Sequence, residues 1–273
     1  TFIASKRIEN CSPGTLERYN DCVTKLVTAL NKRLQDINTN DIRYYLAMYQ
    51  EQRKISMSYM DTIRRYLSSF FAWISDEGYI SRNPMRRLRK IKVPRTIKKP
   101  FTQAEMEHLR CNAECQRDIA IMAFLYSTAA RIGEVVRLNR KDIDWGNKEV
   151  IIYGEKGKKE RRVYLTDDCA YHLHKYLLSR DDTNPALFVS NKRPHTRLGK
   201  QAIQSMLRTL GQKTEIHAHP HKFRRTLLTD AGNRGIPLQE IQMYAGHQKP
   251  DTTMMYVTVS EENVRASFRR YIA

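Results

Sequence analysis

Four residues in the last quarter of the sequence have side chains that can act on a phosphate group. His221 and Arg224 stand three residues apart, and His247 and Tyr256 follow them. An Arg fork binds two phosphate oxygens, a His moves protons near neutral pH, and a phenol can attack phosphorus to form a covalent phosphotyrosine. Their order and spacing predict a phosphodiester-cleaving centre in residues 217–256.

Each of these residues also has an ordinary structural explanation. The chain contains 15 Tyr, most of which must be structural. A single His or Tyr is more often a core residue than a catalyst. The order and spacing of the whole set favour the functional interpretation.

Short helices are expected to position the four residues. A helix that begins at Pro220 would place His221 and Arg224 on one face, because residues three apart are neighbours on a helix. A second helix is predicted to end at the glycine just before His247, and a third to begin shortly before Tyr256. The four side chains would then meet where short elements converge.

Two further cations precede this stretch. Arg131 follows a turn of small residues, 127–130, from which a side chain can point into a cleft. The alternative is a surface ion pair with Glu134, worth only about 0.2–0.5 kcal/mol. Lys156 stands near the tip of a hairpin predicted from the β-rich runs EVIIY and RRVYL. A Lys at a tip is usually a solvated charge, but it can also protonate a leaving oxygen.

The composition indicates a protein that binds a polyanion. The chain has 273 residues and a formal net charge of +19 at pH 7. Nucleic acid is favoured over a membrane because no segment is apolar for the roughly 20 residues that a membrane helix needs. The 5 Cys have no regular spacing and no signal-peptide pattern is found, so a cytoplasmic, bacterial nucleoid-associated protein with free thiols is expected.

The length suits two domains, and basic residues suggest how both bind DNA. Residues 1–80 show helical periodicity throughout, and residues 81–99 contain nine Lys or Arg and no acidic residue. Such charges are often merely solvated, yet the charge of the whole chain favours phosphate contact. The predicted DNA contacts are Lys25, Arg64, Arg65, Arg86, Arg87, Arg89, Lys90, Lys92, Lys158 and Lys159.

These residues, taken in order, resemble the catalytic signature of the tyrosine recombinases, also called the phage integrase family. The matching motifs are Arg131 in ARIGE, Lys156 in EKGKKER, His221 and Arg224 in HKFRR, His247 in AGH and Tyr256 in DTTMMY. The match covers residues 100–273, and residues 1–80 are similar to the helical core-binding domain of the family. The whole ordered set is specific, whereas no single motif in it is.

The resemblance implies a role for each of the six residues. Tyr256 would attack the scissile phosphate, form a 3′-phosphotyrosyl link and release a 5′-hydroxyl. Two arginines, Arg131 and Arg224, would stabilise the added charge of the transition state. His221 would assist proton transfer from Tyr256. Two further roles are implied: His247 would hydrogen-bond the phosphate, and Lys156 would protonate the 5′ oxygen. No metal, cofactor or ATP is expected, because cations of the protein supply the electrostatics.

The resemblance also implies partners and an assembly. The partner is double-stranded DNA, and a C-terminal amphipathic helix, predicted over 260–272, would either fold onto its own domain or dock on a neighbouring subunit. The second arrangement would give a homotetramer around two duplexes on DNA and a monomer without DNA. DNA-bending accessory proteins are further possible partners, and no membrane association is expected.

The expected fold is mainly α, with a helical core DNA-binding domain over 1–80, a basic linker over 81–99 and a mostly helical catalytic domain over 100–273 that contains a small antiparallel β-sheet. The expected function is site-specific recombination that integrates or excises a mobile element, with Xer-type chromosome resolvases as the other similar group. Two alternatives stay open: a type IB topoisomerase-like enzyme that rejoins the original strand, and a non-catalytic DNA-binding accessory protein.

Overall fold

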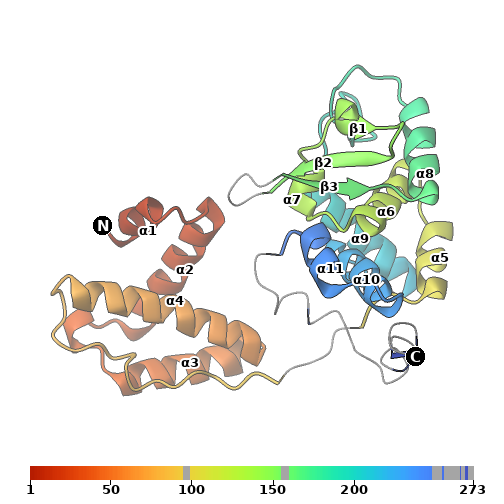
Figure 1. The fold of residues 1–273 in the computed structure, drawn as a ribbon. Coiled ribbons are helices and arrows are strands. Elements are labelled where there is room, and N and C mark those ends of the chain that lie inside the picture. Colours follow the sequence, from red (N-terminus) through yellow and green to blue (C-terminus); the bar gives the residue numbers. More distant parts are fainter. Residues whose placement is uncertain (95–98, 155–159, 248–253, 255–264, 266–267, 270–273) are drawn as a thin grey trace. The chain divides into compact units, whose positions relative to one another are not determined.

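The computed structural model describes residues 1–94, 99–154 and 160–247, together with four single positions, 254, 265, 268 and 269. The chain divides into two compact units, Thr1–Ile97 and Lys98–Ala273. Both are mainly helical, and the second contains a small antiparallel sheet (Figure 1). The predicted fold class is therefore confirmed.

Unit 1 is built from helices, most of which have a side chain that caps the N-terminus. The Ser12 hydroxyl accepts a hydrogen bond from the backbone N–H of Thr15. Asn38 and Asp41 form a capping box at the start of α3. The described helices are α1 (Phe2–Ile8), α2 (Pro13–Leu30), the short 3-10 helix η1 (Leu34–Asp36), α3 (Thr39–Arg53) and α4 (Met57–Asp76).

The core of unit 1 continues into the segment that follows α4. Met85 is buried, and Leu88 and Ile91 pack against the same cluster as the helices. The backbone N–H of Ile91 also donates to the carboxylate of Asp61 on α4, across 3.4 Å. The described part of the predicted linker, residues 81–94, is therefore packed onto unit 1 and is not a free tether.

Unit 2 is organised around helix α6, which is buried along most of its length and lies between the sheet and α10 (Figure 1). The helices of this unit are α5 (Gln103–Cys111), α6 (Gln116–Thr128), α7 (Ile132–Val135), the 3-10 helix η2 (Arg140–Asp142), α8 (Asp167–Leu178), α9 (Lys200–Thr214), α10 (Pro220–Asn233) and α11 (Leu238–Ala245).

The sheet contains the predicted hairpin and one additional strand. Strands β2 (Glu149–Tyr153) and β3 (Glu160–Tyr164) are antiparallel, with Val150 opposite Val163. The two-residue strand β1 (Ile143–Asp144) pairs with β2 and was not predicted, because two residues are too short to show an alternating pattern. The hairpin prediction is confirmed for its two strands.

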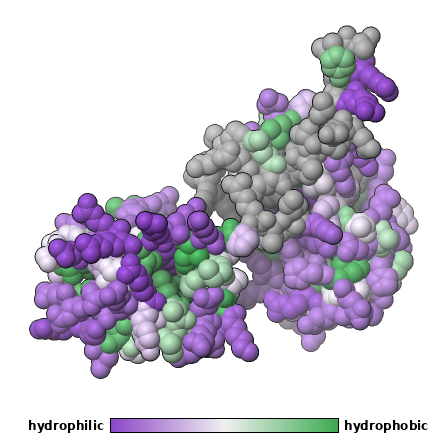
Figure 2. Space-filling view, turned by 90° about the horizontal axis from the view of Figure 1, so that it is seen from below, coloured by the Kyte–Doolittle hydropathy of each residue, from purple (hydrophilic) through white to green (hydrophobic). Residues whose placement is uncertain are grey.

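Several predicted residues lie outside the described part of the chain. They are Lys156, Lys158, Lys159 and Tyr256, together with all but three residues (265, 268 and 269) of the expected C-terminal helix over 260–272. Within the described residues, no helix combines the length and the apolar character needed to cross a membrane. Among the residues coloured by hydropathy in Figure 2, most of those at the surface are hydrophilic, as the high charge of the chain leads one to expect.

Candidate active site

The end of α6 positions Arg131. Ala129 adopts the left-handed conformation, with φ of 47°, and ends the helix, so that Arg131 becomes the N-cap of α7. Its side chain is 36% exposed and donates from Nη2 to the carbonyl oxygen of Gly246 across 3.1 Å. The predicted turn of small residues therefore does aim Arg131 toward the segment that contains His247.

The ion pair between Arg131 and Glu134 is not a surface pair. The Glu134 side chain is fully buried, and it accepts from both the backbone N–H and Nη1 of Arg131, at 2.8 and 3.2 Å. A second arginine, Arg161 of β3, donates to both carboxylate oxygens, at 3.0 and 2.6 Å. Burial alone would raise the pKa of Glu134, but these hydrogen bonds and charges hold it below its ordinary value.

Arg224 is the most deeply placed cation of the site. Its position in the second turn of α10 leaves it 2% exposed. Its guanidinium donates to the carbonyl oxygens of Ala129 and Ala245, at 2.6 and 2.5 Å. Arg224 therefore ties the end of α6 to the end of α11, and its planar fork suits two acceptors that lie on different segments.

His247 follows directly after the C-cap of α11. Gly246 forms that cap with φ of 64°, as predicted from the sequence. The ring Nε2 of His247 lies 2.7 Å from Nη2 of Arg224. Desolvation by burial, followed by the positive charge of Arg224 and of other nearby cations, lowers the pKa of His247 to about 4. The ring is therefore neutral near pH 7.

His221 lines a groove in unit 2. The groove has a volume of about 690 Å³ and is lined by α9 and by the segment that leads into α10. His217 and His219 also line it, with their ring centroids 5.1 Å apart. Of the three imidazoles, His221 is the one on α10 three residues before Arg224, and its charge is among those that lower the pKa of His247.

Two tyrosines close to the site are unsuited to act as the nucleophile. Tyr244 donates its phenol to the carbonyl oxygen of Ser127 across 2.7 Å, and burial is the main cause that raises its pKa to about 12. Tyr126 donates to Asp230, and burial likewise raises its pKa to about 12. Both phenols are engaged in packing, so the assignment of Tyr256 does not compete with them.

The sequence of the chain matches the models of one protein family. The model of the phage integrase family matches residues 95–263, and the model of its N-terminal SAM-like domain matches residues 1–80. The chain belongs to the phage integrase family. It is a tyrosine recombinase, an enzyme that cleaves and rejoins DNA strands at specific sites.

Curated relatives of this recombinase cover nearly its whole length. The chain is 27% identical to tyrosine recombinase XerC of Oceanobacillus iheyensis over 291 residues, which span 99% of this chain and 94% of the relative. It is 30% identical to tyrosine recombinase XerA of Pyrococcus furiosus over 187 residues, or 67% of this chain and 65% of that one. The alternatives of a topoisomerase-like enzyme or an accessory protein are not favoured.

Solved structures agree in fold. The Tn1549 transposon integrase aligns with a TM-score of 0.76 and 19% identity, over 98% of both chains. Lambda integrase aligns with a TM-score of 0.77 and 17% identity, over 94% of this chain and 93% of that one. At these identities the likeness describes the fold of the recombinase and not its individual contacts.

The predicted DNA contacts of unit 1 fall into two groups. Arg64 is 13% exposed and pairs with the nearly buried Asp61 across 2.8 Å. The charge of Arg64 is therefore balanced by a carboxylate inside unit 1. Arg65 is 65% exposed, and Lys25 is 46% exposed beside Asp21. The remaining described contacts are all exposed: Arg86, Arg87, Arg89, Lys90 and Lys92.

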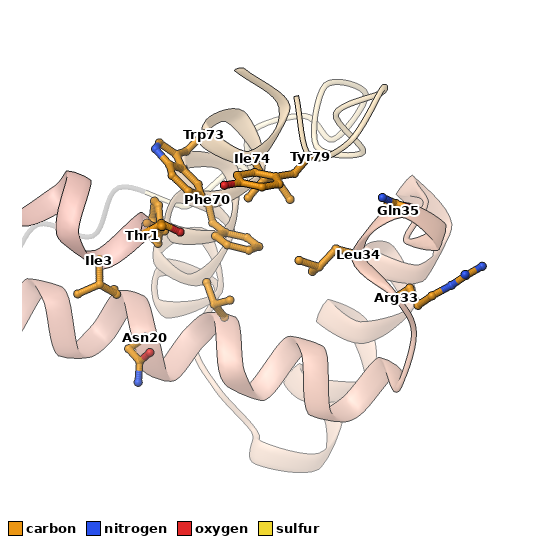
Figure 3. A pocket seen from close by; sticks show the side chains of 12 residues that line it. Thr1, Ile3, Asn20, Arg33, Leu34, Gln35, Phe70, Trp73, Ile74 and Tyr79 are labelled. Carbon is orange, nitrogen blue, oxygen red and sulfur yellow. The ribbon is translucent and has the colours of Figure 1, made fainter. Parts of the chain in front are cut away.

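Unit 1 also contains a groove, of about 660 Å³, that carries none of the candidate catalytic residues. Phe70, Trp73 and Tyr79 line one side of it and Leu34 the other, with Arg33 at the edge (Figure 3). Its apolar lining fits packing rather than phosphate chemistry.

The sequence did not single out two of the residues that shape the site. Arg161 was part of a run interpreted only as a strand, and Tyr244 was part of a helix. The alternation of side chains along β3 could have identified Arg161 as inward-facing, because it lies on the same strand face as the buried Val163.

Among the described residues, no group of three or more His, Cys, Asp or Glu could hold a metal ion.

Proposed function

We propose that this recombinase cleaves DNA through Tyr256 and that Arg131, Arg224 and His247 form the cradle for the scissile phosphate. The convergence of these three residues is the observation that supports the proposal. Arg131 contacts Gly246, and Arg224 contacts both Ala245 and His247, although the arginines lie on separate segments of the chain. Two guanidiniums and a neutral imidazole at one turn form a preorganised site for a phosphate.

The reaction proceeds by exchange of one phosphodiester for another. The phenol oxygen of Tyr256 bonds to phosphorus while the bond to the 5′ oxygen breaks. The phenol proton passes toward His221, and Lys156 supplies a proton to the departing 5′ oxygen. Arg131 and Arg224 stabilise the charge that the non-bridging oxygens gain in the transition state, and His247 donates to the phosphate. A 5′-hydroxyl from the other duplex then reverses the steps and completes strand exchange.

The roles of the two units follow from their charge and from the solved relatives. The transposon integrase structures contain DNA, and a lambda integrase dimer was solved on a core site. We infer that unit 1 and unit 2 of this recombinase both bind duplex DNA, with the exposed cations of residues 81–94 on the phosphate backbone. Four subunits assemble on two duplexes, and DNA-bending proteins assist. The protein acts in the cytoplasm, on the nucleoid.

The finer function is integration or excision of a mobile element, which the likeness in fold to a transposon integrase supports. A specific observation favours a second candidate, the resolution of chromosome dimers. The curated relatives include XerC and XerA recombinases that align over most of the chain. The two functions differ in substrate: integration joins two different sites, whereas resolution recombines two copies of the same site.

The proposal is tested by covalent trapping. The protein is incubated without metal with a nicked suicide duplex taken from the ends of its element, and denaturation-resistant adducts are mapped. We expect an adduct between Tyr256 and a 3′-phosphate, and none with Tyr256→Phe, which should bind the same DNA with nearly unchanged affinity. Tight binding without an adduct, or cleavage by Tyr256→Phe, would overturn the assignment.

A further inference from the structure

Arg161 occupies a core-facing position of strand β3. Strand β3 alternates, so Arg161 shares a face with the fully buried Val163, while Arg162 between them is exposed. The side chain of Arg161 is 9% exposed. A cation at such a position must be fully hydrogen-bonded, because burial of an unpaired charge is costly.

The guanidinium of Arg161 connects three separate elements. Its Nη1 and Nη2 donate to the two carboxylate oxygens of Glu134 in α7, a bidentate arrangement, and its Nε donates to the carbonyl oxygen of Tyr244 in α11 across 3.1 Å. It also packs against Gly246, where an added Cβ would lie 3.1 Å from Cδ of Arg161. Strand β3 is thereby fastened to the turn that precedes His247.

The charges of this cluster explain what Arg161 does for Arg131. Glu134 is fully buried and is shared by two guanidiniums, so the three groups together carry one net positive charge. Of the side-chain hydrogen bonds to Glu134, the two from Arg161 are shorter, at 3.0 and 2.6 Å, than the one from Nη1 of Arg131, at 3.2 Å. Because Arg161 neutralises the carboxylate, the charge of Arg131 is left to act on a phosphate.

We propose that Arg161 is a positioning residue for the cleavage reaction. It neutralises Glu134 and holds the Tyr244–Gly246 turn, so that Arg131 and His247 present their charge and hydrogen bonds to the phosphate. This inference rests on the proposed function, since it assumes that these two residues contact the scissile group. In this proposal Arg161 acts through Glu134 and the turn that precedes His247.

The test compares two suicide substrates under single-turnover conditions, with protein in excess. One has a normal scissile phosphate. In the other, a methyl group replaces one non-bridging oxygen, so that the phosphate is neutral and depends less on Arg131. The variants are Arg161→Met, which keeps apolar bulk but loses all donors, and Arg161→Lys, which keeps the charge but loses the fork. Arg162→Met, at the neighbouring exposed position, is the matched control.

We expect Arg161→Met to slow cleavage of the normal substrate on the order of 100-fold, the cost of misplacing a catalytic group by about 1 Å. On the neutral substrate, the factor by which Arg161→Met slows cleavage should be at least about tenfold smaller. The affinity of this variant for DNA should change little. Arg161→Lys should be intermediate, and Arg162→Met should cleave like wild type. Equal slowing on both substrates would overturn the proposal, because a general structural defect affects both equally.

A double variant keeps the test informative if Arg161→Met folds poorly. Replacing the pair together, as Glu134→Gln with Arg161→Met, removes the uncompensated buried carboxylate and should restore folding. If Arg161 acts by neutralising Glu134, this double variant should cleave faster than Arg161→Met alone. A slower double variant would refute that role.

A wild-type protein that binds its site without forming the Tyr256 adduct would overturn the proposed function itself, and this inference with it.

Discussion

Nη2 of Arg224 and Nε2 of His247 lie 2.7 Å apart, and this contact determines which ring nitrogen of the imidazole carries the proton. A guanidinium has donors and no acceptors, so Nε2 of His247 must be the acceptor. The ring proton is then on Nδ1, and the ring is neutral. A neutral ring beside three arginines adds no further positive charge to a site that already has an excess.

The pKa of His247 provides the first prediction. Burial and the neighbouring cations lower it from 6.5 to about 4 in the folded protein. Between these two pH values the unfolded chain binds more protons than the folded one, so the free energy of unfolding should fall as the pH drops from about 6.5 to 4. Above about pH 6.5 the free energy of unfolding should no longer depend on the titration of His247.

Nuclear magnetic resonance of the His ring protons in the DNA-free protein measures this directly. The signal that disappears in His247→Gln should titrate near pH 4, and the variant should lose part of the pH dependence of unfolding. A His247 signal that titrates near 6.5 would contradict the contact with Arg224.

Gly246 provides a prediction with an internal control. Both Gly246 and Gly235 have positive φ, 64° and 83°, so Ala at either position should cost about 1–2 kcal/mol of stability. An added Cβ at Gly246 would also lie within 3.3 Å of Nε and Nη1 of Arg161, whereas nothing lies within 4 Å at Gly235. Gly246→Ala should therefore slow cleavage at least about tenfold, and Gly235→Ala should not.

Chemical denaturation and single-turnover cleavage, measured on both glycine variants, separate the two effects. Equal cleavage rates would show that the contact between Gly246 and Arg161 has no catalytic importance, even if both proteins are destabilised.

Lys156 can be tested through its leaving group. Lys156→Ala should slow cleavage of an ordinary duplex by about 10²–10⁴-fold, the usual contribution of a general acid. On a duplex with sulfur in place of the 5′ bridging oxygen the loss should be much smaller, because a thiolate leaves without a proton. Lys141→Ala, a change at an exposed lysine of the same unit, should behave like wild type on both duplexes. Equal slowing of Lys156→Ala on both would remove Lys156 from the acid role.

The basic residues of unit 1 should differ in what they contribute. Arg87 is exposed, so Arg87→Ala should weaken DNA binding and reduce the slope of log affinity against log salt by about 1, with little change in stability. Arg64 neutralises the nearly buried Asp61, so Arg64→Ala should instead cost about 1–3 kcal/mol of stability. Its salt slope should remain that of wild type.

Titrations at several salt concentrations, paired with denaturation curves, compare these two variants. An unchanged salt slope for Arg87→Ala would exclude it as a phosphate contact, and a reduced slope for Arg64→Ala would show that Arg64 reaches DNA after all.

Much of this fold is determined by local sequence. The hairpin of β2 and β3 and the end of α11 at Gly246 were predicted, and the structure confirms them. The N-caps at Ser12 and Thr102 are equally local features. Each depends on residues a few positions apart, where hydrogen bonds form within a turn or a strand pair. The order of the candidate catalytic residues is likewise a property of the sequence, and it predicted the family correctly.

Only the tertiary structure decided how those residues are held. Arg161 reaches Glu134 across 27 positions of the chain and Tyr244 across 83, and Arg131 reaches Gly246 across 115. No local pattern specifies such contacts. Packing also decides burial: the partner of Arg131, Glu134, is fully buried, and Arg64 pairs with Asp61 inside unit 1. A charge on a helix looks the same in sequence whether it faces water or a buried partner, because only packing removes the water.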